Sequence, residues 1–252
     1  MNKTIIKKEF HESLFDCKGL WLIVACACAL SGLCVLVISI KEGSVLAQND
    51  VLQYAMKAAM FLTVTISMVL GSACFATERE ENTMESLLLT PVRKRDLVIA
   101  KYLGVMLIGV ALYIVCVPYL AAIGLGSGLT WRAIAMTFFG GILLLTAFTA
   151  LAVVFSIKMK SSRAAILTSI LGMTVLTVPA LIKGLFKLSP LGLTILKIDP
   201  IACCFDMMDA VLVEKQPFFS QWGYILPLVG FAVITIALML YCGKSIALKG
   251  EK

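Results

Sequence analysis

Six long apolar runs, separated by charged segments, most constrain what this chain can fold into. They cover residues 20–40, 58–76, 102–123, 133–156, 164–182 and 222–241. Each has about 20 residues, the length that an α-helix needs to cross the ~30 Å hydrocarbon core of a bilayer. Strands of a membrane barrel would be about half as long and would alternate apolar with polar residues. The sequence therefore predicts an all-α integral membrane protein with six transmembrane helices in a single domain, residues 1–252.

The composition supports a membrane location. Hydrophobic residues make up 60% of the 252 residues, and charged residues make up only 15%. A chain with so few charged groups is not a soluble globular protein. We therefore expect a multi-pass protein of the cell (inner or cytoplasmic) membrane.

Groups for catalysis or ion coupling are missing from the apolar runs. The single histidine, His11, lies outside them, so a zinc site or a Ser/His dyad within a span cannot be built. All 15 acidic residues also lie outside, which is unusual for an ion-coupled carrier. The sequence contains no G-x-x-x-x-G-K-[ST] phosphate loop. We expect no catalytic, cofactor or metal site in this chain, and an energy source in another chain.

Lysine and arginine counts predict the orientation. If the N-terminus is cytoplasmic, the inner segments hold 15 of the 22 lysines and arginines, and the outer segments hold 7. Cytoplasmic loops of membrane proteins are enriched in these residues. We therefore expect both termini to be cytoplasmic, with the basic charge facing lipid headgroups and not nucleic acid.

Amphipathic segments precede the first run and the last one. Apolar residues recur every three or four positions before the first span, which predicts an interfacial N-terminal helix with or without a mechanical role; they are Ile6, Phe10, Leu14, Cys17 and Trp21. In the outer segment 183–221, Ser189 and Asp199 each precede a proline and predict helix starts at Pro190 and Pro200. We expect two short helices there, re-entrant in the outer membrane surface or packed on the bundle.

The densely charged segment 76–96 lies between the second and third runs. Thr77 with Glu80, and Asn82 with Glu85, both fit the S/T/N-x-x-E pattern of a helix start, and the second start is favoured. From Asn82, an apolar stripe leads to Pro91, which ends a helix; the stripe is Met84, Leu87 and Leu88. The segment is either a solvated loop that obeys the positive-inside rule or a docking surface for a soluble partner.

The same segment resembles the signature of the type-2 family of ATP-binding cassette (ABC) transporter permeases. That signature is a Glu-Arg-Glu-x-Gly-Thr-x-Glu-x-Leu run followed by a proline and by a lysine at the next span. The matching residues here are Glu78, Arg79, Glu80, Thr83, Glu85, Leu87, Pro91 and Lys101. Asn82 replaces the usual glycine, and both residue types tolerate the same backbone conformations.

The resemblance implies a coupling helix that sits in a groove of a cytoplasmic ABC ATPase. Its expected coupling residues are Glu78, Arg79, Glu80, Glu81, Thr83, Met84, Glu85, Leu87, Leu88 and Pro91. The apolar residues would enter the groove, and Glu80, Glu81 and Glu85 would meet basic groups on its rim. ATP and magnesium would be bound by the ATPase and not by this chain.

The resemblance also implies a second permease chain, in a homodimer or a heterodimer. Small residues that allow close helix contact are available for such a dimer at Gly140, Gly141, Ala147 and Gly172. The expected function is a permease subunit that forms the translocation path for export. The alternative is a non-transporting membrane module that transmits ATPase-driven movement to a periplasmic or cell-surface partner.

Overall fold

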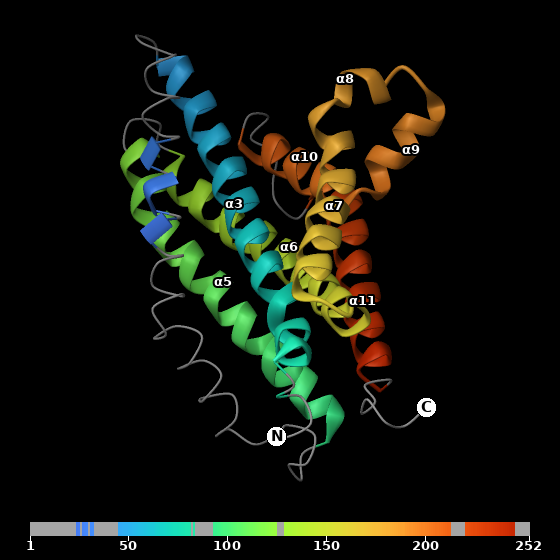
Figure 1. The fold of residues 1–252 in the computed structure, drawn as a ribbon. Coiled ribbons are helices and arrows are strands. Elements are labelled where there is room, and N and C mark those ends of the chain that lie inside the picture. Colours follow the sequence, from blue (N-terminus) through green and yellow to red (C-terminus); the bar gives the residue numbers. More distant parts are fainter. Residues whose placement is uncertain are drawn as a thin grey trace.

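The structure is a computed structural model that describes residues 24, 25, 27–29, 31, 32, 45–81, 83, 93–124, 129–212 and 220–244. Within these residues it contains helices and no strand, and five helices are long and apolar enough to cross a membrane. Those five are α3 (Val45–Glu80), α5 (Lys94–Gly124), α6 (Thr130–Lys158), α7 (Ser162–Leu181) and α11 (Trp222–Lys244). The all-helical prediction is therefore confirmed for the described part of the chain (Figure 1).

The first predicted span and the interfacial helix before it lie mostly outside the described residues. Residues 24, 25, 27–29, 31 and 32 are helical. The Ser31 hydroxyl donates hydrogen bonds to the Ala27 carbonyl at 2.8 Å and to the Tyr119 hydroxyl at 3.1 Å. These contacts place the middle of the first apolar run beside α5.

Two of the long helices extend well beyond their apolar runs. α3 begins at Val45 and continues to Glu80, so much of the predicted outer loop 41–57 is helical. α5 begins at Lys94 and not near residue 102. Apolarity marks only the part of a helix inside the hydrocarbon core, whereas the backbone hydrogen bonds continue into the headgroup region. For the same reason the predicted helix start at Thr77 is wrong, because Thr77 lies inside α3.

The central helix of the bundle is α6, which contacts all four other long helices and α10. Its close packing depends on small residues. A Cβ at Gly141 would lie 2.6 Å from the Tyr113 ring of α5, and one at Gly140 would lie 2.8 Å from the Cys204 sulfur. Ala147 is fully buried in the same helix. Contrary to our expectation, these three positions are filled by neighbours within the chain and present no open surface to a second chain.

Three shorter helices connect α7 to α11: α8 (Lys183–Phe186), α9 (Pro190–Ile198) and α10 (Pro200–Leu212). The helix starts at Pro190 and Pro200 are those that the sequence predicts. Asp199 caps α10, since its carboxylate accepts hydrogen bonds from the backbone N–H groups of Ile201 and Ala202 at 3.3 and 3.2 Å.

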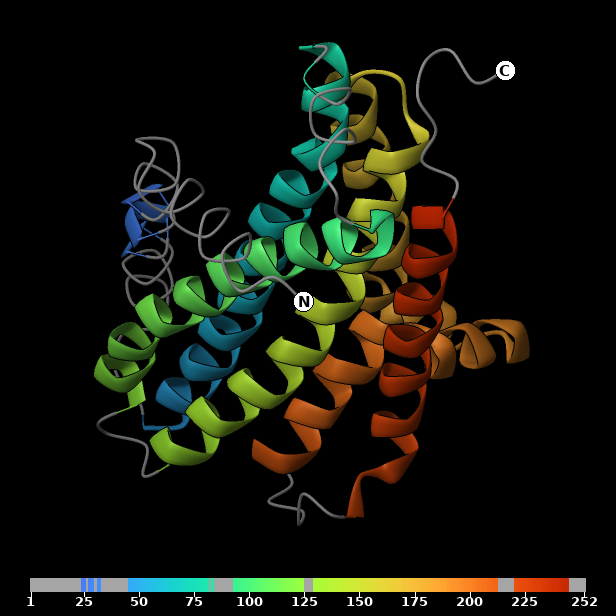
Figure 2. The ribbon, with the colours of Figure 1, turned by 90° about the horizontal axis from the view of Figure 1, so that it is seen from below.

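The three connecting helices differ in burial. α8 and α9 project from the bundle in both views, whereas α10 lies against it (Figures 1 and 2). Most α9 side chains are exposed, but nearly all of α10 is buried, including the free thiols of Cys203 and Cys204. In the first turn of α9, a Cβ on Gly192 would lie 2.0 Å from the Phe186 carbonyl oxygen, so the close approach of α9 to the end of α8 requires glycine.

Candidate functional site

Four long helices begin or end close together at one end of the bundle, opposite α8, α9 and α10 (Figure 1). α3 ends there at Glu80, α5 begins at Lys94, α6 ends at Lys158 and α7 begins at Ser162. The Glu-Arg-Glu sequence of the predicted coupling segment forms the last turn of α3. We call Glu78, Arg79 and Glu80 the clamp, because each of them contacts a different neighbouring helix.

Glu78 connects α3 to α5. Its Oε1 atom lies 2.6 Å from Nζ of Lys101, and the side chains of Lys101 and Glu78 are only 6% and 19% exposed. The Lys101 ammonium also lies 5.4 Å from the centre of the Phe75 ring, a cation–π contact. A buried pair of this kind is costly to break, because the remaining charge would be left without its partner.

Arg79 connects α3 to the end of α6. Its two terminal nitrogens donate hydrogen bonds to the backbone carbonyls of Met159 and Ile157, at 2.6 and 2.9 Å. The last carbonyls of a helix have no partner within the helix, and they carry the negative end of its dipole. The guanidinium therefore satisfies two such carbonyls and places its positive charge where the dipole favours it.

Glu80 connects α3 to the start of α7. Its Oε1 atom accepts a hydrogen bond from the backbone N–H of Ser162 at 3.0 Å. A carboxylate is favoured at a helix N-terminus by the unpaired N–H groups and the positive end of the dipole. Ser161 completes this N-terminus, because its hydroxyl accepts a hydrogen bond from the N–H of Ala164 at 3.2 Å. Glu80 and Ser161 thus share the capping of α7.

Two hydroxyl groups support the clamp. Thr83 donates from both its backbone N–H and its hydroxyl to the Glu78 carbonyl, at 3.0 and 3.3 Å, which satisfies a carbonyl at the end of α3. One turn earlier, the Ser156 hydroxyl of α6 accepts from the N–H groups of Phe75 and Ala76, at 2.8 and 3.1 Å. The end of α3 is therefore bonded to α6 through both side chain and backbone.

The predicted coupling residues fall into three groups. The clamp residues are brought together with Lys101, and their described contacts are within the chain. Glu81 and Thr83 are exposed directly after the clamp. Met84, Glu85, Leu87, Leu88 and Pro91, with the favoured helix start at Asn82, lie outside the described residues.

The contacts of Arg79 and Glu80 are those that sequence reasoning missed. Our interpretation placed Glu80 among acids facing an ATPase, whereas the structure shows it capping α7. A signal was present in Ser161, a favoured N-cap residue directly before a helical run. Backbone carbonyls, which Arg79 binds, leave no such signal because every residue carries one.

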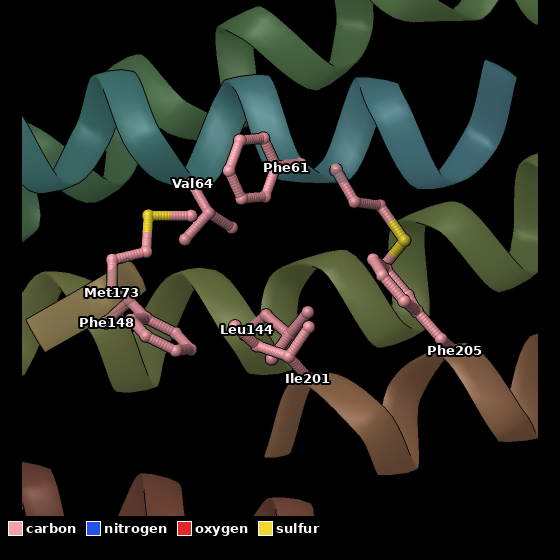
Figure 3. Close-up of a pocket in the computed structure, with 8 residues that line it drawn as sticks. Phe61, Val64, Leu144, Phe148, Met173, Ile201 and Phe205 are labelled. Atoms are coloured by element: carbon pink, nitrogen blue, oxygen red, sulfur yellow. The ribbon is translucent and has the colours of Figure 1, made fainter. Parts of the chain in front are cut away.

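A small apolar pocket lies between α3, α6, α7 and α10 (Figure 3). It has a volume of about 10 Å³, about the space of one water molecule. The lining residues are Met60, Phe61, Val64, Leu144, Phe148, Met173, Ile201 and Phe205. Among the described residues, no group of three or more histidine, cysteine, aspartate or glutamate side chains is placed to hold a metal ion.

Together, the long apolar helices and the clamp that joins their ends define a multi-pass helical membrane protein. The sequence profile of the family described as ABC-2 family transporter protein matches residues 36–241. The chain therefore belongs to this family and is a permease component of an ABC transporter. A comparison with curated proteins finds no match.

Membership of this family indicates which class of protein this chain works with. Components of this family provide the membrane part of a transporter and are generally not catalytic themselves. An ATPase is accordingly the partner that the family implies. The matched range contains the clamp, the predicted coupling segment, four of the five described long helices in full, and α11 up to residue 241.

Proposed function

We propose that this chain is an exporting permease subunit that receives ATP-driven movement through residues 81–92 and passes it to four helices through the clamp. The clamp end faces the cytoplasm in this proposal, and the ATPase there binds ATP and magnesium. A second permease chain, identical or related, completes the translocation path.

The clamp carries this proposal, because it turns a local contact into a movement of several helices. Glu78, Arg79 and Glu80 lie only a few residues before the expected docking stripe at Met84 and Leu87. Their contacts reach α5, α6 and α7 within three consecutive residues. A displacement of residues 81–92 would therefore act on four helix ends at once, and not on α3 alone.

The apolar stripe should dominate docking to the ATPase. Burying a leucine contributes ~1.5–3 kcal/mol, whereas an exposed ion pair contributes ~0–1 kcal/mol. We expect Leu87→Asp with Leu88→Asp to insert normally into the membrane but to lose the co-purifying ATPase and transport-linked ATP hydrolysis. Glu85→Lys should be milder and more sensitive to salt.

The matched control is Leu87→Met with Leu88→Met, which changes the same positions but keeps them apolar. This variant should retain the ATPase at close to the wild-type level. Measurement of ATPase co-purification and hydrolysis in both variants tests the proposal. Wild-type co-purification and hydrolysis in the double aspartate variant would show that this segment is a solvated loop.

A further inference from the structure

A second charged contact holds α10 to α3 at the opposite end of the bundle. The Asp209 carboxylate of α10 lies 2.6 Å from Nζ of Lys57 and accepts a hydrogen bond from Nε2 of Gln53 at 2.5 Å. Both partners belong to α3, one turn apart. We call Lys57, Gln53 and Asp209 the tie. Nearby, Lys183 of α8 forms an ion pair with Asp206, so α10 is held from two sides.

The tie lies at the edge of the apolar pocket. Lys57 is followed on α3 by the lining residues Met60, Phe61 and Val64, and its ammonium is 5.6 Å from the centre of the Phe205 ring. Phe205 and Ile201 are the contributions of α10 to the lining (Figure 3). α10 therefore covers one side of the pocket, and the tie holds it there.

The tie and the clamp are parts of the same helix. α3 runs from Val45 to Glu80 without an internal proline. At 1.5 Å per residue, Lys57 and Glu78 are about 30 Å apart along its axis. Glycine–serine pairs are common places for a helix to bend, and Gly71-Ser72 of α3 is such a pair, but it packs against α6, where a Cβ on Gly71 would lie 3.2 Å from the Ala152 Cβ. A movement at one end of α3 can therefore be carried along the helix to the other.

We propose that Lys57 and Asp209 are positioning residues that make α10 move with α3, so that a movement entering α3 at the clamp changes access to the apolar pocket. That the movement comes from an ATPase rests on the proposed function, whereas the contact between α3 and α10 does not. Its effect on α10 can therefore be tested without the ATPase.

The first experiment measures how readily the native thiols of α10 react. Cys203 and Cys204 belong to α10 and are buried where it packs on the rest of the chain, so N-ethylmaleimide should modify them slowly in the full chain in membranes. Asp209→Lys places like charges together, and local opening of α10 should raise their labelling rate roughly tenfold. Adding Lys57→Asp restores opposite charges, and the rate should return to near the wild-type value.

Cys116 and Cys242 are buried elsewhere and serve as internal controls, with each site quantified by peptide mass spectrometry. Their labelling should stay unchanged in both variants, because general unfolding would expose all four thiols. Two outcomes overturn the tie. One is an unchanged rate at Cys203 and Cys204 in Asp209→Lys, and the other is an increase that Lys57→Asp does not reverse.

The second experiment tests whether α10 responds to ATP. In the complex with its ATPase, adding ATP with vanadate should change labelling at Cys203 and Cys204 in the wild type. Asp209→Ala should keep the ATPase bound but lose this change, which a merely stabilising role would leave in place. A bound ATPase with nucleotide-independent labelling in the wild type would overturn this inference and leave the proposed function standing. Loss of ATPase binding is the result expected for Leu87→Asp with Leu88→Asp, and it tests the proposed function and not the tie.

Discussion

Charged side chains hold α3 near both ends of the bundle, at the clamp and at the tie, but the contacts differ in burial and in the groups they use. At the clamp, Lys101 and Glu78 are 6% and 19% exposed. At the tie, Lys57 and Asp209 are 21% and 36% exposed. Clamp residues also bond to backbone groups of α6 and α7, whereas the tie joins side chains only.

This difference suggests that the two ends have different mechanical roles. Contacts with backbone groups at helix ends fix the positions of the helices. Removing one partner of a buried ion pair strongly destabilises the fold, because the other charge stays buried without a partner. An ion pair that is partly in water contributes ~0–1 kcal/mol and can break and re-form. The clamp end should therefore behave as one rigid junction, whereas the α10 end can change its contacts during a transport cycle.

The largest expected effect is at the buried pair of the clamp. Lys101→Met leaves the Glu78 carboxylate without its cation, and we expect a loss of stability of about 3 kcal/mol. Adding Glu78→Gln removes the uncompensated charge and should recover most of it. Asp209→Asn, at the tie, should cost no more than about 1 kcal/mol. Thermal unfolding in detergent checks all three variants.

Equal losses for Lys101→Met and Asp209→Asn would break the comparison between the two ends. Failure of Glu78→Gln to recover stability would instead show that the Lys101 charge acts through its cation–π contact with Phe75. Because methionine keeps most of the bulk of lysine, the double variant separates the ion pair with Glu78 from this second contact.

An intermediate effect is expected at Arg79. Arg79→Ala removes two charged hydrogen bonds to the end of α6, but Arg79 is only half-buried and water can replace part of them, so we expect a total loss of about 2 kcal/mol. Because Arg79 donates to two separate carbonyls, Arg79→Lys should retain only part of this contribution. In the ATPase complex, transport-linked hydrolysis should fall further in Arg79→Ala than in Arg79→Lys, with the ATPase still bound. Wild-type stability and hydrolysis in Arg79→Ala would contradict a rigid junction.

The smallest effect is a pH dependence at α10. Burial raises the pKa of Asp199 from 3.8 to about 6, and the hydrogen bonds from Ala202 and Ile201 offset part of this rise. Between these pKa values the folded chain binds a proton that the unfolded chain does not. Stability from this group therefore falls as pH rises from about 4 to 6.

Asp199→Asn keeps an acceptor for the α10 cap but cannot ionise. On acidification from pH 7.5 to 5, the wild type should gain stability relative to this variant, on the order of 1 kcal/mol. The measurement is the difference between the unfolding midpoints of wild type and variant, taken at each of the two pH values. Other titrating groups are the same in both proteins, so their contribution cancels in this difference. A relative loss on acidification, or no difference, would contradict the burial of an ionisable Asp199.

Five of the six predicted spans correspond to described long helices, and the clamp was predicted only in part. Runs of about 20 apolar residues locate spans because the hydrocarbon core has a fixed thickness. Helix ends are harder to locate, because α3 and α5 continue where the environment becomes polar. The helix starts at Pro190 and Pro200 were predictable, since both depend on adjacent residues only.

The family signature located the clamp residues, but their structural partners were not predicted. The resemblance placed Lys101 in the same signature as Glu78, without indicating that the two form a pair. The partners of Glu80 and Arg79 are backbone groups about 80 positions away in sequence. Backbone groups are the same in nearly every residue, so no sequence motif can identify these partners.

By itself, the sequence determined that the chain is a helical membrane protein, where most of its spans lie, and which segment carries the family signature. These properties follow from local composition and spacing, which act without regard to the rest of the chain. Only the tertiary structure decided that Glu78, Arg79 and Glu80 join four helices, that Gly140 and Gly141 are filled from within, and that Asp209 holds α10 to α3. Each of these depends on how helices distant in sequence pack together, and burial decides how strongly each charged contact holds them.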